Sequence, residues 1–486
     1  MASAPPGTFA AGESAKRRIA RALFLASFLS YACFLQEPLD ANVSSRMFLT
    51  LSLVKHGEVS IDRYAAHTID KAEHEGRFYC DKAPGLSFLG IPAVAFVSRV
   101  LYGNAGIGDP GTSSQYYWAA YAATVTTAGL LTALSVAIVF LLALDLFGSA
   151  GGALVVALAY GMATPAFGWA TAFVGHAPAT ALLVIGFHCL RRLRRGEPDG
   201  RRDVRLAAAG TACLAWAVVT EFTVAPLAAV LLVVYGARIL APGGDRARLV
   251  RCVLLTGAAC AAPLLLYNQV AFGAPWHLGY QSVSGFPGMK QGFLGIGTPS
   301  LPVLGEILAG PRRGILLLCP LLLLVPFGLL RMLARKEQRG TAILIVVVGL
   351  YYLLLNASYF YWDGGWSTGP RHITGTMPFL CLALGAVWGP AGRGARGAVL
   401  ALVGVSALLT VMATTAGMFA SSEIQNLVRD HVLKGFLDGS STAVPVHELG
   451  WRSRDFVRAL VVAWVLALGV FLRLAAAGRR AAVVTP

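Results

Sequence analysis

Long apolar runs separated by short polar connections occupy most of the chain. A helix needs about 20 mostly apolar residues to cross the hydrocarbon core of a bilayer, so each run predicts one membrane span. About twelve full spans are expected on this length criterion, near residues 19–36, 117–144, 150–168, 175–190, 206–221, 223–240, 252–270, 314–332, 341–357, 373–389, 398–418 and 456–474.

One more apolar segment, residues 85–102, contains Arg99 and breaks the alternation of the loops if it crosses the bilayer completely. We expect an irregular helix here that lies partly in the membrane interface. The pattern therefore predicts an all-α, polytopic membrane protein with roughly 12 to 13 transmembrane helices.

Basic residues gather in short clusters between the apolar runs, and cytoplasmic loops carry an excess of Lys and Arg. On this rule both termini are cytoplasmic, together with residues 191–205, 241–251 and 333–340. The outer loops are then 37–82, 271–313, 358–372 and 419–455.

The predicted organisation is one transmembrane domain over residues 16–480. A disordered cytoplasmic tail rich in Ala, Pro, Gly and Ser precedes it over residues 1–15. A short cytoplasmic tail follows it over residues 481–486.

The composition excludes the soluble alternatives. Hydrophobic residues make up 56% of the chain and charged residues 13%, where a soluble domain carries about a quarter charged residues. The net charge of +16 would indicate nucleic-acid binding if the basic residues shared one surface, but they are divided among many loops. The eight cysteines lack the spacing of a disulfide framework or a zinc site.

Acidic residues are concentrated in the first outer loop, which holds eight of the 24 in the chain. Within this loop, residues 45–54 carry apolar side chains at helical spacing and predict a short amphipathic helix on the membrane surface. Lys82 stands where the chain re-enters the bilayer, at the height of a lipid phosphate. A solvated connector is the competing interpretation of this loop.

Several short motifs resemble the GT-C superfamily of membrane glycosyltransferases. They are NVSSR at 42–46, GEVSID at 57–62, DKAPG at 81–85 and YWDGGWSTGPRH at 361–372, followed by MPF at 377–379. The closest resemblance is to the bacterial branch similar to aminoarabinose transferase and protein O-mannosyltransferase. It implies a multi-pass protein of the bacterial inner membrane with an outward-facing site and juxtamembrane helices in the first outer loop. Such an enzyme transfers a hexosyl or pentosyl group from a polyprenyl-phosphate carrier to a lipid, glycan or protein acceptor.

Displacing a polyprenyl phosphate from a sugar needs a base for the acceptor proton and cations for the growing phosphate charge. The family usually places an acid just ahead of the arginine that is Arg46 here, and this chain lacks it. Asp62 and then Asp40 are therefore the predicted bases, with Asp70 and Asp81 as weaker candidates. Lys82, Arg371 and His372 are the predicted carrier-phosphate ligands, although Arg371 also suits a residue that reaches the interface. The remaining substrate-loop candidates are Arg46, Asp81, Trp362, Asp363 and Trp366.

A divalent metal is an open option because carboxylates cluster in the first outer loop, but no ligand spacing specifies one. Glu221 and His176, at predicted outer turns, are weaker functional candidates that helix–helix hydrogen bonding explains equally well. A transporter or lipid flippase is the main alternative function, and a catalytically inactive GT-C relative in envelope assembly is another. Transporters place their charges near the bilayer midplane, whereas here the charges crowd into outer loops.

Overall fold

The computed structural model describes residues 13–103, 107–193, 200–239 and 246–483. Of the predicted tails, residues 13–15 belong to the start of α1 and 481–483 to the end of α20, and the rest lie outside the described residues. The chain forms two compact units, each assembled from separate stretches of sequence. The first comprises Met1–Gln36, Thr132–Thr171 and Thr298–Pro486, and the second comprises Glu37–Leu131 and Ala172–Gly297. A single domain over 16–480 stays a prediction.

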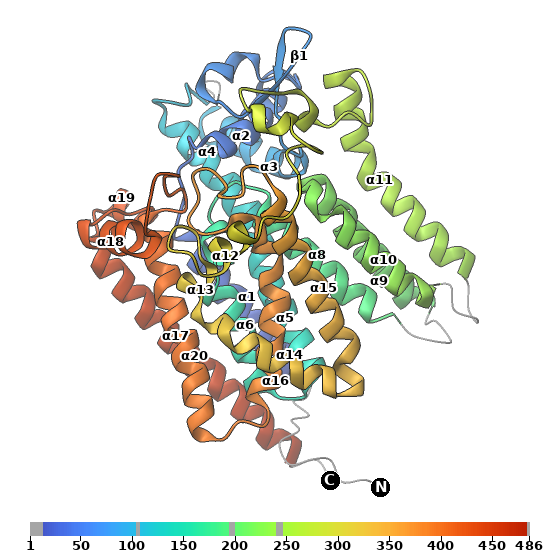
Figure 1. Ribbon diagram of the computed structural model, residues 1–486, viewed down its shortest axis with the longest axis vertical. Helices are drawn as coiled ribbons and strands as arrows, with labels where there is room; N and C mark the ends of the chain where they lie inside the picture. Colours follow the sequence, from blue (N-terminus) through green and yellow to red (C-terminus); the bar gives the residue numbers. More distant parts are fainter. Residues whose placement is uncertain (1–12, 104–106, 194–199, 240–245, 484–486) are drawn as a thin grey trace. The chain divides into compact units, whose positions relative to one another are not determined.

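The second unit contains long helices and a small loop-rich portion. Its helices and short turns are α2 (Ala41–His56), η1 (Asp62–His67), α3 (Gly85–Phe96), η2 (Val97–Leu101), α4 (Ser114–Thr124), η4 (Val125–Gly129), α8 (His176–Arg191), α9 (Gly200–Thr220), η5 (Phe222–Val224), α10 (Ala225–Ile239), α11 (Arg246–Phe272), η6 (Gly279–Ser282) and η7 (Pro287–Lys290). Helix α9 packs between α8 and α11, as the green ribbons of Figure 1 show.

The first unit consists almost entirely of helices. They are α1 (Glu13–Ala32), most of α5 (Leu130–Phe147), α6 (Ala150–Ala163), α7 (Ala166–Trp169), α12 (Leu301–Ala309), α13 (Ile315–Leu318), η8 (Pro320–Leu324), α14 (Val325–Ala334), α15 (Lys336–Ser358), η9 (Arg371–Thr376), α16 (Met377–Trp388), α17 (Arg393–Ala416), η10 (Val428–Leu433), α18 (Lys434–Asp438), α19 (Val444–Leu449) and α20 (Ser453–Val483). Tyr31 and Phe34 pack edge-on against Phe167 in its core, and Phe34 also contacts Phe456 near the start of α20.

Five helices among the described residues are long and apolar enough to cross a membrane. They are Ser114–Phe147, Gly200–Thr220, Arg246–Phe272, Lys336–Ser358 and Arg393–Ala416. Helix α11 leaves Leu254, Leu255 and Leu266 about two-thirds exposed. Apolar side chains exposed along one helix are expected of a surface that faces lipid. Shorter apolar helices include 85–101, where the sequence predicts an irregular segment and the helix contains Pro92 and a π-helical turn.

A hairpin in the first outer loop is a feature that the sequence interpretation did not include. Strands β1 (Lys71–His74) and β2 (Arg77–Tyr79) pair antiparallel, and β3 (Val283–Ser284) adds to the other edge of β1. The two-residue turn, Glu75-Gly76, has positive φ angles at both positions, which a two-residue hairpin of type I′ requires.

Helix α2 is longer and more buried than predicted. It begins after Asp40, whose carboxylate accepts a hydrogen bond from the Asn42 amide, and ends at Gly57 with φ of 66°. Every residue from Asn42 to Ser52 is buried. The predicted amphipathic helix at 45–54 is therefore a helix, but its polar face packs inside the protein instead of facing water.

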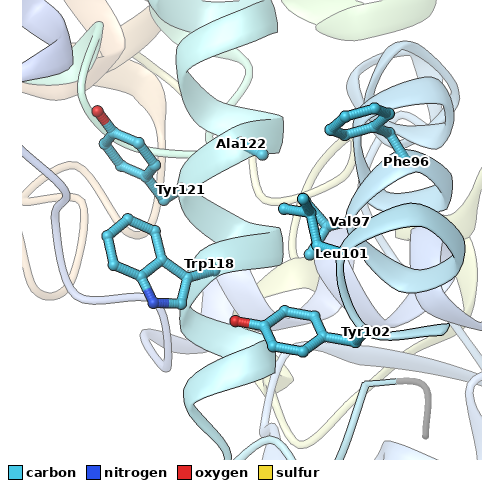
Figure 2. Close-up of a pocket in the computed structure, with 7 residues that line it drawn as sticks. All are labelled: Phe96, Val97, Leu101, Tyr102, Trp118, Tyr121 and Ala122. Carbon is cyan, nitrogen blue, oxygen red and sulfur yellow. The ribbon is translucent and has the colours of Figure 1, made fainter.

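An apolar pocket of about 420 Å³ lies beside α4 in the second unit (Figure 2). Aromatic and aliphatic side chains from α3, η2, Tyr102 and α4 form its walls. They are Phe96, Val97, Leu101, Tyr102, Trp118, Tyr121 and Ala122. None of these side chains is charged, so the pocket offers no acid, base or phosphate ligand.

Candidate active site

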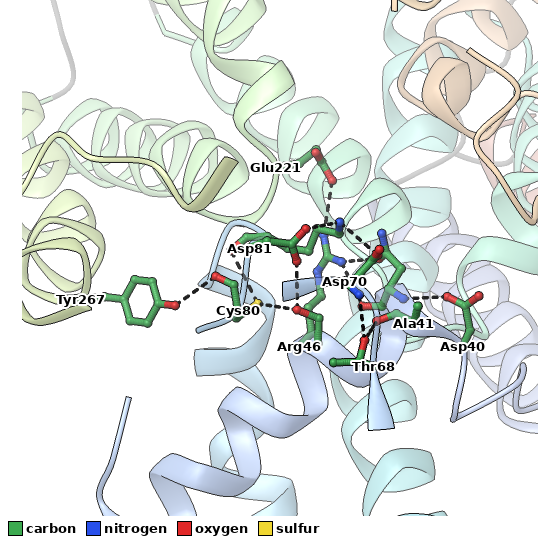
Figure 3. Close-up of polar contacts among 12 residues, drawn as sticks. Asp40, Ala41, Arg46, Thr68, Asp70, Cys80, Asp81, Glu221 and Tyr267 are labelled. Atoms are coloured by element: carbon green, nitrogen blue, oxygen red, sulfur yellow. Dashed lines mark hydrogen bonds and ion pairs between the residues drawn. The ribbon is translucent and has the colours of Figure 1, made fainter. Parts of the chain in front are cut away.

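A buried group of one lysine and two aspartates lies in the first outer loop. Lys82 Nζ is 3.0 Å from Asp70 Oδ2 and 2.6 Å from Asp81 Oδ2. Asp81 is 1% exposed and Asp70 8% exposed. We call Asp70, Asp81 and Lys82 the lysine–aspartate cluster; Figure 3 shows its two aspartates.

The hairpin explains how these residues meet. Asp70 directly precedes β1, while Asp81 and Lys82 follow β2, so antiparallel pairing brings the two ends of the hairpin together. Ser45 of α2 then donates a hydrogen bond of 3.0 Å to Asp81 Oδ1. The cluster is therefore held by the hairpin and by α2 at once.

The segment after α11 contacts the cluster. The Tyr280 ring centroid is 5.8 Å from Lys82 Nζ, within the range of a cation–π interaction. The neighbouring Gly279 packs against the backbone of Asp81 so closely that an added Cβ would lie 2.9 Å from the Asp81 carbonyl oxygen. Glycine is thus the residue that this close approach allows.

Burial and charge shift the titration of the cluster. Burial raises the pKa of Asp81 above its ordinary value and the nearby Asp70 raises it further, while Lys82 opposes both effects. Burial acts to lower the pKa of Lys82, but Asp70 and Asp81 outweigh it and raise that pKa well above its usual value. Lys82 therefore stays a cation, and Asp81 is a stronger base than an exposed aspartate.

Arg46 occupies a second buried ionic group in the same unit. Its guanidinium lies 3.7 Å from Glu221 Oε2, and His176 Nδ1 is 3.5 Å from the same oxygen. Glu221 sits between α9 and η5, and His176 is the first residue of α8. Gly175 leaves room for this group, because an added Cβ would lie 2.7 Å from Glu221 Oε2. The ion pair ties α2 to the ends of α8 and α9.

The two bases favoured from the sequence have different partners. Asp62 is paired with Arg77 at 3.0 Å and accepts a hydrogen bond of 2.6 Å from the Phe78 amide, which links η1 to β2. Asp40 caps the start of α2. These contacts fix Asp62 against β2 and Asp40 at the start of α2. Their catalytic role stays a prediction.

The remaining predicted residues lie in the first unit, on the segment between α15 and α16. Arg371 begins η9, and its buried Nε has no hydrogen-bond partner among the described residues. The His372 ring packs edge-on against Tyr359. Arg312 lies over the Trp362 ring at 5.7 Å, and Trp366 is 60% exposed. Lys82 belongs to the other unit, so joint binding of one phosphate by Lys82, Arg371 and His372 stays a prediction.

Arg313 holds this segment together. It is fully buried, and its guanidinium donates to the carbonyl oxygens of Asp363, Gly365, Ser421 and Arg312 at 3.0 to 3.2 Å. We expect Arg313→Ala to lower the free energy of unfolding by about 3–5 kcal/mol, because four partly buried carbonyl oxygens lose a charged donor and the buried side chain leaves a cavity. Thermal unfolding of the purified protein in detergent measures this loss.

Arg396 is the matched control for that prediction. It lies over the Trp388 ring, with 5.2 Å between its guanidinium carbon and the ring centroid, and its side chain is exposed where that of Arg313 is buried. Arg396→Ala should leave the unfolding temperature nearly unchanged. Equal unfolding temperatures for the two variants would show that the Arg313 hydrogen bonds do not stabilise the segment.

No group of three or more His, Cys, Asp and Glu side chains within the described residues is arranged to hold a metal ion. The two carboxylates of the cluster share the ammonium of Lys82 instead.

Asp70 and Glu221 received less weight from the sequence than the structure gives them. Asp70 lies in a polar stretch with no local sign of burial. The signal that could have identified it is the Glu75-Gly76 pair, a possible hairpin turn that would bring Asp70 near Asp81 and Lys82. Glu221 interrupts two apolar runs, which marks it as an unusual residue but does not identify Arg46 as its partner.

Comparison with known proteins supports the fold. No protein-family model matches the sequence, and no curated protein matches it. The crystal structure of ArnT from Cupriavidus metallidurans bound to undecaprenyl phosphate is similar, with a TM-score of 0.55 and 13% sequence identity over 96% of this chain and 74% of that one. The apo structure of ArnT gives a TM-score of 0.50 and 17% identity with the same coverage.

ArnT is a GT-C aminoarabinose transferase. The likeness shows that this chain has the membrane GT-C fold, which confirms the fold that the resemblance of the short motifs implied. The exact number of spans stays a prediction.

Proposed function

We propose that this protein is a glycosyltransferase that moves a sugar from a polyprenyl-phosphate carrier to an acceptor outside the bacterial cytoplasmic membrane. The observation that carries the proposal is the lysine–aspartate cluster, which combines a buried cation and buried carboxylates within a GT-C fold. The similar structure of ArnT holds undecaprenyl phosphate, a carrier of the proposed class.

The reaction needs a group that accepts the proton of the acceptor hydroxyl. The base is proposed to be Asp81, because burial raises its pKa and Ser45 fixes one of its oxygens. A carboxylate with a raised pKa takes up a proton more readily at neutral pH than an ordinary one. Asp62 and Asp40 remain rivals, and each already serves a structural contact.

The reaction also needs cations for the leaving phosphate. Lys82 is the proposed ligand from the first outer loop, and Arg371 with His372 from the segment before α16. Arginine suits this role through its planar fork of donors, and the Arg371 Nε lacks a hydrogen-bond partner within the described residues. Trp362, Asp363, Trp366 and Arg46 are proposed to shape the substrate loops.

A transporter or lipid flippase is the second candidate function. The observation that favours it is Glu221, an ionisable residue at the break between α9 and α10, because transporters bind substrates at discontinuous helices. Mass spectrometry of envelope glycans from cells with and without the protein separates the two. Loss of one sugar residue from a glycan, lipid or protein supports transfer. Accumulation of an otherwise complete lipid-linked precursor on the inner side supports transport.

The proposed orientation places the first outer loop outside the cell. We expect a membrane-impermeant thiol reagent to label Glu75→Cys, at the exposed hairpin turn, in intact cells. Glu337→Cys at the start of α15 should react only after the cells are lysed, because it adjoins a basic cluster predicted to be cytoplasmic. Both variants are made in a background without the eight native cysteines. The reverse labelling pattern would place the proposed site in the cytoplasm.

A further inference from the structure

We propose that the carrier phosphate takes the place of Asp70 on Lys82, that this exchange activates Asp81 as the catalytic base, and that Asp70 sets the affinity of the exchange. This inference rests on the proposed function and deepens it. In the free protein the ammonium of Lys82 is held by the two carboxylates of the lysine–aspartate cluster. The two carboxylates engage two of the three N–H donors of Lys82 and offset its positive charge, so a phosphate binds Lys82 in competition with them.

The geometry makes the two aspartates unequal partners in the exchange. Asp81 is hydrogen-bonded through its other oxygen to Ser45 of α2, so its position does not depend on Lys82 alone. The Asp70 side chain is fixed by Lys82 at 3.0 Å, while its backbone amide binds the Thr68 hydroxyl. Asp70 is thus the carboxylate that gives way to a phosphate, and Asp81 stays in place beside it.

Loss of the lysine partner changes the chemistry of Asp81. Lys82 is the largest influence that holds down the pKa of Asp81, against burial and the neighbouring Asp70. When a phosphate binds the ammonium of Lys82, its negative charge offsets the positive charge that holds down the pKa of Asp81. Asp81 then becomes more basic. The base is then strongest when the carrier is bound, and it is restrained by Lys82 when the carrier is absent.

The transfer step balances with these groups. The acceptor oxygen forms a bond to the anomeric carbon while the bond from that carbon to the phosphate oxygen breaks. The bonding electron pair stays on the phosphate, and the acceptor proton moves to the Asp81 carboxylate. Polyprenyl phosphate leaves with one more negative charge than the phosphodiester donor had. Asp81 returns to the carboxylate by passing its proton to the phosphate or to water.

Release of the product follows from the same competition. The added charge strengthens the hold of Lys82 on polyprenyl phosphate. Asp70 and Asp81 oppose this, because their oxygens are already within 3.0 Å of the ammonium when the site is free. Asp70 therefore favours turnover by weakening product binding.

The test compares Asp70→Asn with the parent protein in binding and transfer. Polyprenyl phosphate should bind the variant about 10- to 100-fold more tightly, the equivalent of one hydrogen bond between charged groups. Turnover should become limited by product release and show stronger inhibition by added polyprenyl phosphate. Asp70→Ala is the second variant, and it should shift binding in the same direction.

Glu58→Gln is the matched control. Glu58 lies in the same outer loop and forms an ion pair of 3.6 Å with Arg63, but the Glu58 side chain is 39% exposed, unlike the buried Asp70. This change should leave carrier binding and turnover as in the parent.

The outcomes separate the inference from the proposed function. A parent protein that neither binds polyprenyl phosphate nor transfers a sugar from it contradicts the proposed function. A different result is a parent protein that does both, while Asp70→Asn and Asp70→Ala bind polyprenyl phosphate no more tightly. That result overturns the proposed exchange on Lys82 and leaves the proposed function standing. Thermal unfolding in detergent identifies an Asp70 variant that does not fold. The exchange is then tested with the other Asp70 variant.

Discussion

Asp81→Asn is expected to lower the rate of sugar transfer by about 10² to 10⁴, the usual contribution of a general base. Asparagine keeps the shape of the side chain and its hydrogen bond with Ser45, but it does not accept the acceptor proton. Carrier binding should survive, because the ammonium of Lys82 loses a competitor. The measurement is single-turnover transfer from a lipid-linked sugar, together with carrier binding, in the full-length protein.

The pH profile adds a second readout for Asp81. Asp81 must be a carboxylate to act as the base. The rate of transfer should therefore increase as the pH rises through the pKa of Asp81, and it should be low at a pH below that pKa. Burial raises this pKa above its ordinary value, Lys82 and the Ser45 hydroxyl lower it, and Asp70 raises it. Full turnover in Asp81→Asn, with a large loss in Asp62→Asn or Asp40→Asn, would instead assign the base to the position that the sequence favoured.

Lys82→Ala is expected to weaken binding of the carrier phosphate by about 10- to 100-fold, because one charge-assisted hydrogen bond is removed. The same change leaves Asp70 and Asp81 side by side without their cation, so one of them should bind a proton. Titration of polyprenyl phosphate into the purified protein measures the loss. Lys82→Arg keeps the positive charge but changes the shape of the side chain. Comparing it with Lys82→Ala separates the effect of the lost charge on carrier binding from the effect of the changed shape.

Lys290→Ala serves as the control for Lys82. Lys290 ends η7 in the segment after α11, where its side chain is exposed. Its removal changes the net charge of the protein equally and should not change carrier binding. Equal weakening of carrier binding in both variants would indicate general electrostatic attraction instead of a specific contact. Such an attraction becomes stronger as the salt concentration is lowered.

Hydropathy and charge patterning predicted most of the helices in this fold. Apolar runs near 252–270, 341–357 and 398–418 correspond to α11, α15 and α17, because a lipid-facing helix must be apolar along its whole length. The irregular segment at 85–102 was also recognised, from Arg99 and from the following loop, which has no Lys or Arg. These features are local, and a short window of sequence contains the information.

The arrangement of the candidate site depended on contacts that no local window contains. Asp70 joins Lys82 only because a hairpin folds between them, and its turn uses Glu75 where asparagine is more usual. The pairing of Arg46 with Glu221 joins α2 to the end of α9, two elements that are far apart in the sequence. The sequence identified Lys82 and Arg46 as functional candidates, but their partners became evident only from the folded chain.

The burial of α2 shows a further limit of pattern analysis. Its apolar residues Met47, Leu51 and Val54 indicated one apolar face, and the Ser and Thr residues between them indicated a solvent-exposed face. In the structure Thr50 donates to the carbonyl oxygens of Arg46 and Ser87, and Ser87 donates to the Arg46 carbonyl. Small hydroxyl side chains satisfied in this way pack inside the protein, so their polarity does not mark a solvent-facing surface.

Transfer by the purified protein tests the central claim most directly. The full-length chain in lipid nanodiscs is given a polyprenyl-phosphate sugar labelled in the sugar, with envelope extract as the source of acceptor. We expect the label to pass to an acceptor molecule and unsubstituted polyprenyl phosphate to appear in equal amount, with both products reduced by Asp81→Asn. Recovery of the intact labelled carrier, with no covalent product from a folded parent protein, would contradict the assignment as a glycosyltransferase.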